Sequence, residues 1–368
     1  MSAPRPRHRR DNPTPSPRLP KAAGSLASGS AEGSQALRAI GRGWDNPRCR
    51  RGPIAGTLLL LLSAGCGSTA ALRSGAPRKA LPLPPEMAAY YDYPDHSPKA
   101  TRELLRVSHG VREQRVRFPL SATGFEPTEP VVEIEWFQAD RPGRRPAILF
   151  NPILGGDYPL ERGICLYLAR HGFHVALIHR KTLKIAPEHG VAHIELLLRQ
   201  GVLRMRQAVD WMGAQEEVDP ARLGSFGISM GGIASALAAA VEPRLKVHVI
   251  GLAGGSIADI LVATHDPLLA KPRSRYLAAR RLRLSELDAE LRRAVVTDPI
   301  RLAPYVDPSR ILMIMAGFDR TIGRANALRL WQALGRPRAV TLPLGHYTSY
   351  LALPYVKRIS LRQFQREL

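Results

Sequence analysis

The sequence predicts an α/β fold: a mostly parallel central sheet with helices on both faces. Continuous apolar runs alternate with helix-period segments from about residue 146 to the C-terminus, which is typical of parallel strands joined by crossover helices. One of these runs ends abruptly in a glycine-framed serine followed by a small-residue helix. An apolar fraction of 45% in 368 residues is ample for one large core.

Two short runs precede the alternating region and have the period of two that marks a half-buried strand. "QRVRFPL" and "VVEIEWFQ", at 114–120 and 131–138, predict an antiparallel hairpin at a sheet edge. After the turn signal "RPGRRP", the continuous run "AILFN" at 147–151 predicts a buried parallel strand.

The remaining elements follow in βα order, with no internal repeat and no second core. The segment 255–308 interrupts this order as an insert rich in helix-forming residues. The predicted elements are a helix near 159–171, a strand at 173–179, a long helix at 192–213, a strand ending at Ile228, a helix from Ser229, a strand at 246–252, a strand at 311–317, a helix near 323–335 and a strand at 339–345.

The N-terminal region has the composition of a targeting segment rather than of a folded domain. Residues 1–47 are rich in Pro, Ser, Gly and Arg, which predicts a disordered leader, and we expect the true translation start to lie downstream of Met1. Residues 48–65 combine three arginines, a nine-residue apolar run and small residues, the pattern of a signal peptide. Residues 66–100 are expected to be a tether to a folded domain at 101–368.

The small residues that end at Cys66 resemble the cleavage box of bacterial lipoproteins, although Ser63 stands where that box most often has Leu. The resemblance implies a lipid on Cys66 and a membrane-anchored protein of the cell envelope, facing the periplasm or the exterior. The alternative is a leader on a cytoplasmic enzyme, or an anchor that is not cleaved. Three cysteines do not make a disulfide framework.

A formal net charge of +22 raises the question of nucleic acid. The sequence shows no nucleic-acid motif and no aromatic-basic repeat, so we expect no nucleic-acid partner and a preference for anionic surfaces such as lipid head groups. A cluster of Arg280, Arg281 and Arg283 in the insert fits either an acidic ligand or a solvated helix face.

The stretch Gly227-Ile228-Ser229-Met230-Gly231 fits G-x-S-x-G in a strand-turn-helix setting, which indicates a nucleophile elbow. Flanking glycines avoid clashes between strand and helix, and the helix N-terminus favours developing negative charge. The alternative is a small residue at a tight helix entry.

A serine hydroxyl needs a base, commonly a histidine oriented by a carboxylate. Asp319 and His346 each follow the carboxyl end of a predicted strand, in the chain order Ser, acid, His. Asp307 precedes its strand and so lies at the wrong end of the sheet. The blander alternatives are a helix cap for Asp319 and a solvated loop residue for His346.

Residues 146–352 resemble the α/β-hydrolase fold, with "AGFDRTI" and "GHYTSY" as the acid and histidine loops; the resemblance is nearest to dienelactone-hydrolase-like and acetyl-esterase-like bacterial enzymes. It implies a helical lid in the insert at about 255–308. It also implies an oxyanion hole from the Met230 amide and an amide of the loop that begins Asn151-Pro152. The family commonly has His-Gly there; Pro152 has no N–H, so Ile153 or Leu154 must donate, and Ile153 is favoured by position.

Together these features predict a serine hydrolase that cleaves carboxylic esters of small molecules through Ser229, Asp319 and His346, with no metal and no organic cofactor. A peptidase or thioesterase with the same triad is an alternative, as is an inactive lipid-anchored binding protein. His189 and His193 lie four residues apart, but no third ligand accompanies them, so no metal site is expected.

Overall fold

The computed structural model describes residues 70–72, 74–75, 78–94, 99–155, 157–180 and 187–368. The chain divides after Cys66 into two compact units, and all the described residues belong to the second, Gly67–Leu368. The predicted leader, the signal peptide and Cys66 therefore lie outside the described residues. None of the helices in the described ranges combines the length and apolar composition needed to cross a membrane.

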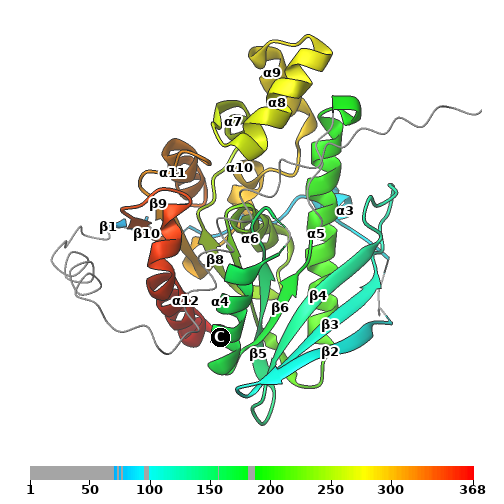
Figure 1. Ribbon diagram of the computed structural model, residues 1–368, viewed down its shortest axis with the longest axis vertical. Coiled ribbons are helices and arrows are strands. Elements are labelled where there is room, and N and C mark those ends of the chain that lie inside the picture. The colour runs from blue at the N-terminus through cyan, green and yellow to red at the C-terminus, as the bar shows by residue number, and fades with distance from the viewer. Residues whose placement is uncertain (1–69, 73, 76–77, 95–98, 156, 181–186) are drawn as a thin grey trace, which may run out of the picture. The chain divides into compact units, whose positions relative to one another are not determined.

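A ten-stranded sheet, counted over the described residues, organises this unit in the order β1-β10-β9-β8-β7-β5-β6-β4-β3-β2 (Figure 1). The six strands from β10 to β6 in that order are parallel, and the strands outside them are antiparallel to their neighbours. This confirms the mostly parallel sheet. The strands are β1 (Ala70–Leu72), β2 (Thr101–Ser108), β3 (Val111–Pro119), β4 (Val131–Ala139), β5 (Arg145–Asn151), β6 (His174–Ile178), β7 (Val218–Ile228), β8 (Leu245–Gly251), β9 (Ile311–Ala316) and β10 (Arg338–Leu342).

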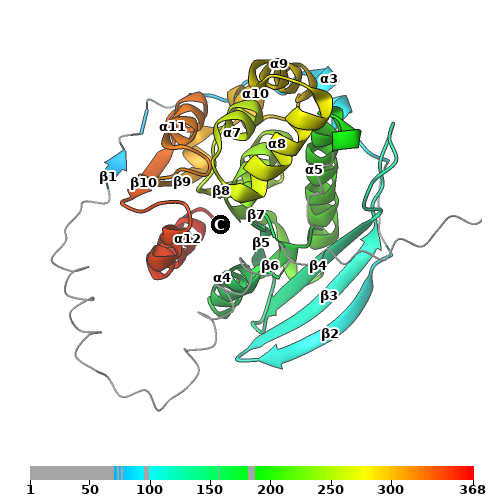
Figure 2. The same ribbon diagram turned by 45° about the horizontal axis from the view of Figure 1, so that its top comes forward.

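Helices cover both faces of the sheet, which is why its central strands are continuous apolar runs (Figure 2). One face packs against α4 and α12, and the other against α5, α6 and α11. The helices are α3 (Pro85–Tyr90), α4 (Pro159–Arg170), α5 (Ala192–Gly213), α6 (Met230–Val241), α7 (Ile257–Ala263), α8 (Pro267–Arg280), α9 (Leu284–Ala294), α10 (Pro299–Leu302), α11 (Arg324–Ala333) and α12 (Leu353–Glu367).

The insert is helical, as predicted: α7 to α10 lie between β8 and β9, and we refer to these four helices as the lid. The predicted hairpin is β3 and β4, which pair antiparallel without interruption. It does not end the sheet, however, because β2 pairs with β3 and forms the edge. Nearly every side chain of β2 is exposed, so its sequence lacks the alternation that would have revealed it.

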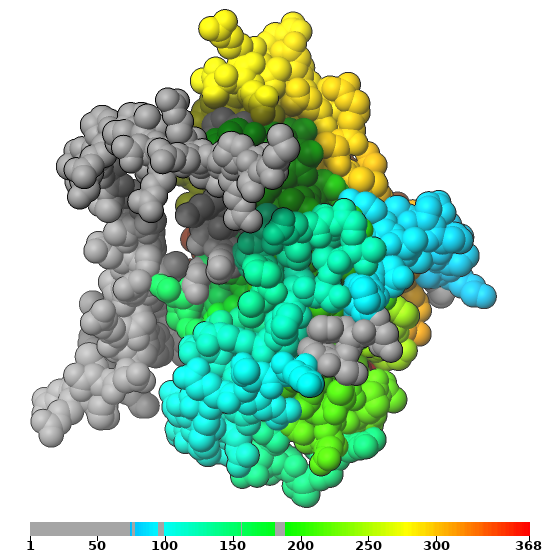
Figure 3. Space-filling model, turned by 90° about the vertical axis from the view of Figure 1, so that its right-hand side faces the viewer, coloured from blue at the N-terminus to red at the C-terminus, as the bar shows by residue number. Residues whose placement is uncertain are grey.

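The expectation of a tether at 66–100 is not met by the described part of that segment. Residues 70–72 form β1 and pair with β10. The Arg78 guanidinium donates to the carbonyls of Ala303 (2.8 Å) and Ala333 (3.2 Å), and Tyr91 is buried with its hydroxyl 2.9 Å from Thr297 Oγ1. Figure 3 shows residues 78–94, in blue, beside the rest of this unit. A Pro-rich composition suggested a linker, but the tertiary contacts of a few side chains decide otherwise.

Candidate active site

The turn between β7 and α6 presents Ser229 in a strained conformation. Its backbone has φ 59° and ψ −120°, a region that side-chain-bearing residues rarely adopt. The glycines around it are required by close backbone approach: a Cβ on Gly227 would lie 1.9 Å from the Gly231 oxygen, and one on Gly231 would lie 2.0 Å from the Asn151 oxygen. Close packing of the backbone therefore requires glycine at both positions. The tight turn that results places Ser229 at the carboxyl edge of the sheet.

The three side chains predicted to act together form one hydrogen-bonded row. Ser229 Oγ lies 2.9 Å from His346 Nε2, and His346 Nδ1 lies 2.7 Å from Asp319 Oδ2. Each residue follows a parallel strand, namely β7, β9 and β10, and parallel strands bring their carboxyl ends to one edge. Both the imidazole and the carboxylate are nearly inaccessible to solvent.

The surroundings of Asp319 define the proton arrangement of the row. Burial by itself raises the pKa of Asp319, but hydrogen bonds from His346 and from the amides of Ile322 and Thr321 outweigh it and lower the pKa below its usual value. Asp319 is thus an ionised acceptor, so His346 Nδ1 carries the proton that it donates. In the neutral imidazole, Nε2 then accepts from the Ser229 hydroxyl, as a general base must.

The loop after β5 is held by two side chains that the sequence analysis did not single out. The Ile153 amide donates to Glu161 Oε1 at 3.1 Å. From the other side, Arg180 Nη2 donates to the carbonyls of Pro152 (3.1 Å) and Ile153 (2.6 Å). The Pro152–Ile153 peptide is therefore fixed by a carboxylate and a guanidinium.

Glu161 is a buried carboxyl on the inner face of α4, and its Oε2 has no hydrogen-bond partner within the described residues. Burial raises its pKa, while the hydrogen bonds to Oε1 and the nearby Arg162 and Arg180 oppose the shift. One signal could have revealed it: Glu161 lies at helical spacing from the apolar residues Ile164 and Leu168. An acid on the apolar side of a predicted helix needs a partner.

The lid is joined to the acid and histidine loops through Asp266, the residue that caps α8. Asp266 Oδ1 accepts from the Leu268 amide at 2.9 Å, and Oδ2 accepts from Thr321 Oγ1 at 3.2 Å and from the Tyr347 hydroxyl. Burial, together with the hydrogen bond to Asp266, raises the pKa of Tyr347. The residue that follows His346 is thus anchored to the lid.

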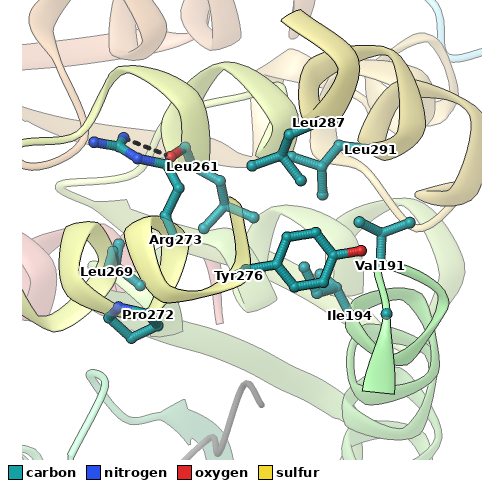
Figure 4. Close-up of a pocket in the computed structure, with 10 residues that line it drawn as sticks. Val191, Ile194, Leu261, Leu269, Pro272, Arg273, Tyr276, Leu287 and Leu291 are labelled. Carbon is teal, nitrogen blue, oxygen red and sulfur yellow. Dashed lines mark hydrogen bonds between the residues drawn. The ribbon is translucent and has the colours of Figure 1, made fainter. Parts of the chain in front are cut away.

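A mostly apolar pocket lies within the lid, where side chains from the start of α5 and from α7, α8 and α9 converge (Figure 4). Arg273 closes one side by donating to the carbonyls of Leu261, Val262 and Thr264. None of Ser229, His346 and Asp319 lines this pocket. Its apolar lining includes Val191, Ile194, Leu261, Tyr276, Leu287 and Leu291.

Comparison with known proteins gives few sequence relatives. No family model matches the chain. Two uncharacterized proteins of Mycobacterium tuberculosis, from strains CDC 1551 / Oshkosh and ATCC 25618 / H37Rv, are each 29% identical over 158 residues. The match covers 42% of this chain and spans 35% of the length of each relative.

Solved structures are more informative. Acetyl xylan esterase 1 from Thermoanaerobacterium sp. JW/SL YS485 is 19% identical (TM-score 0.55; 77% of this chain and 96% of that one). An acetyl xylan esterase from Paenibacillus sp. R4 is 16% identical (TM-score 0.56; 78% and 100%). The chain has the α/β-hydrolase fold. An acylaminoacyl peptidase of Pyrococcus horikoshii shares this hydrolase fold at 14% identity (TM-score 0.51; 70% and 42%).

The sequence also drew attention to two histidines and to the cysteines, and the described ones among them do not form a second catalytic or metal-binding site. His189 and His193 stack with ring centroids 4.4 Å apart, and in the described ranges no group of three or more His, Cys, Asp or Glu could hold a metal ion. Cys165 is a free, fully buried thiol whose pKa burial raises, so it is protonated and inert. Cys66 lies outside the described residues.

Proposed function

We propose that this protein is a serine hydrolase that cleaves carboxylic ester bonds of small-molecule substrates. One observation carries the proposal: Ser229, His346 and Asp319 form an unbroken hydrogen-bonded row at the carboxyl edge of the sheet. A serine paired in this way with a neutral imidazole is primed for acyl transfer.

In the first step, Ser229 Oγ attacks the ester carbonyl carbon and its proton passes to His346 Nε2. Asp319 stabilises the imidazolium that results. The tetrahedral intermediate collapses, the bond to the alcohol oxygen breaks, and His346 returns the proton to that oxygen. An alcohol leaves, and the acyl group remains on Ser229.

In the second step, His346 accepts a proton from a water molecule, which attacks the acyl carbon. The bond to Ser229 Oγ breaks and that oxygen takes the proton back, releasing a carboxylic acid. Side chains and water supply every proton and electron pair in both steps, so the proposed reaction needs no metal and no organic cofactor.

The negative oxygen of each intermediate needs two donors. We propose the Met230 amide, which opens α6 and has no carbonyl four residues behind it within the helix, and the Ile153 amide. The Ile153 amide donates to Glu161 in the structure, so its use requires the hydrogen bond to pass from Glu161 to the substrate. The Leu154 amide is the other candidate on this loop.

The test is Ser229→Ala with a short-chain nitrophenyl ester. We expect kcat to fall by at least about 10³-fold, because no other group can accept the acyl chain. Ser285→Ala, at an exposed serine of α9, is the matched control and should retain wild-type turnover. Unchanged turnover in Ser229→Ala would refute the proposal.

Two alternatives remain within the same geometry. The similarity to two acetyl xylan esterases supports ester cleavage, and the similarity to an acylaminoacyl peptidase supports peptide cleavage. Rates on matched ester, thioester and aminoacyl substrates separate esterase, thioesterase and peptidase. Failure of a fluorophosphonate probe to label Ser229 would instead indicate an inactive binding protein.

We further propose that Cys66 carries a lipid and that the protein is anchored in a bacterial cell-envelope membrane. The support is the sequence pattern that precedes Cys66. Mass spectrometry of the mature N-terminus should find a lipid-modified Cys66, and Cys66→Ser should move the protein out of the membrane fraction. A mature chain that begins at Met1 would rule out the anchor and leave the cytoplasmic alternative.

A further inference from the structure

Large apolar side chains lie exposed around the proposed active site. Phe318 directly precedes Asp319, and Tyr347 directly follows His346. Exposed apolar groups gathered in one place mark an interaction surface. We call the group the catalytic rim: Leu268, Phe318, Tyr347, Tyr350 and Leu351, whose relative exposure ranges from 40% to 70%.

The rim is held together by hydrogen bonds between its segments. The Phe318 amide donates to the Leu344 carbonyl at 3.0 Å, which joins the acid loop to the histidine loop. The Tyr347 hydroxyl donates to Asp266, and the same carboxylate accepts from the Leu268 amide at the start of α8. The lid and both catalytic loops therefore contribute to one surface.

The exposed charges on the three segments that carry the rim have one sign. The segments that carry the rim contain two carboxylates, those of Asp266 and Asp319, and both are buried. Lys271, Arg320 and Arg324 are exposed on the same segments, and none of them has a carboxylate partner among the residues that the structure describes. The segments are 264–275, 317–324 and 343–358.

The edge strand β2 offers a comparison. Leu104 and Val107 are as exposed as the rim side chains, at 61% and 63%. The strand carries two ion pairs, Arg106 with Glu113 at 2.8 Å and Glu103 with Arg115, whereas Arg102 donates to the amide oxygen of Gln215 and has no carboxylate partner in the described ranges. The difference is one of balance: β2 carries an exposed carboxylate, Glu103, among its charges, whereas the described segments of the rim carry none that is exposed.

We propose that the catalytic rim docks on an anionic lipid surface. Aromatic and aliphatic side chains enter the interface between head groups and acyl chains, and the arginines and lysine lie at the level of the lipid phosphates. Docking places the loops that carry Asp319 and His346 at the membrane. This proposal goes beyond ester hydrolysis and is independent of a lipid on Cys66.

The test measures partition of the full chain onto vesicles of phosphatidylcholine, alone or mixed with phosphatidylglycerol. Every protein carries Ser229→Ala and Cys66→Ser, so neither hydrolysis nor a lipid anchor contributes, and the N-terminal basic residues are common to all. Failure of the ester proposal therefore leaves this test intact.

The expected result is tighter binding of the parent to vesicles that contain phosphatidylglycerol, weakening as salt is added. Phe318→Ser/Leu351→Ser should reduce partition about tenfold on those vesicles, because two partly inserted apolar groups are lost. Arg320→Gln/Arg324→Gln should reduce it by a similar factor and flatten the salt dependence. The matched control, Leu104→Ser/Val107→Ser on β2, should bind as the parent does.

Thermal midpoints within about 4 °C of the parent show that each variant is folded. A parent that does not prefer anionic vesicles overturns the proposal, and so does a control variant that loses as much binding as the rim variants. If the rim variants bind vesicles normally but raise the KM for a long-chain soluble ester in the Ser229 protein, the rim receives a substrate tail and the membrane proposal is wrong.

Discussion

The two sides of the proposed oxyanion hole are built differently. At Ser229, backbone packs against backbone, and the glycines leave no room for a single Cβ. At Ile153, the loop after β5 is held by the side chains of Glu161 and Arg180. The first side is determined by steric exclusion, so Gly227 and Gly231 cannot take a side chain unless the backbone around them moves. The second depends on the charge and length of two side chains, so substitutions of Glu161 or Arg180 can change the position of the loop by degrees.

The largest effect is expected on the elbow side, from Asp319→Asn. Asn keeps an oxygen for the Thr321 and Ile322 amides but presents an NH₂ group to His346, which forces the proton onto Nε2 and removes the base. We expect kcat to fall about 10⁴-fold in ester assays. Asp307→Asn, before β9 at the opposite end of the sheet, is the control; equal losses in both variants would contradict the assigned role of Asp319.

Gly231→Ala tests whether close backbone packing determines the turn at Ser229. The new Cβ would lie 2.0 Å from the Asn151 oxygen, so the strand and the helix must separate. We expect a loss of about 3 kcal/mol or more in the free energy of unfolding, measured by denaturant titration. Gly201→Ala, in the middle of α5 with open space for its Cβ, should instead gain about 0.5–1 kcal/mol.

Glu161→Ala tests the side held by side chains. Loss of the acceptor frees the Pro152–Ile153 peptide to move, and we expect kcat to fall about tenfold to a hundredfold with little change in KM. Glu161→Gln retains an acceptor for the Ile153 amide and should stay within about threefold of the wild type. A higher kcat in Glu161→Ala would show that Glu161 withholds the amide from the substrate.

The smallest effect concerns the attachment of α4, the helix that carries Glu161. Burial alone raises the pKa of Glu135, but the His179 ring, whose Nε2 lies 3.2 Å from Oε1, and hydrogen bonds from Arg162 outweigh it and lower the pKa from 4.5 to about 2. Because the folded-state pKa is the lower one, this stabilisation is present above about pH 4.5 and is lost as the pH falls toward 2.

Glu135→Gln keeps hydrogen bonds and loses the charge, so it should cost about 1 kcal/mol of unfolding free energy at pH 7. The difference between the two proteins should shrink between pH 4.5 and pH 2. A difference that is constant over this range in denaturant titrations would mean that the charge of Glu135 plays no part.

A part of the site could be predicted from the sequence when it depends on residues that are close together in the chain, and not when it depends on contacts between distant segments. Ser229, Asp319 and His346 could be placed from sequence because each follows a strand, and parallel strands share a carboxyl edge. Glu161 could not be assigned, because its contact with Ile153 depends on how α4 packs over the end of β5. Arg78, Tyr91 and the edge strand β2 were missed for the same reason: their partners are distant in sequence, or their exposure removes any periodic signal.

The sequence by itself determined the order of strands and helices from β5 onward, the glycine-framed turn and the order of the three residues that follow their strands, because these depend on local backbone sterics and on short-range apolar periodicity. Only the tertiary structure decided that Glu161 and Arg180 hold the loop after β5. The hydrogen bonds that join the lid to the loops of Asp319 and His346 were likewise decided at that level. Both arise where segments far apart in the chain pack together, and no local pattern specifies which side chains then meet.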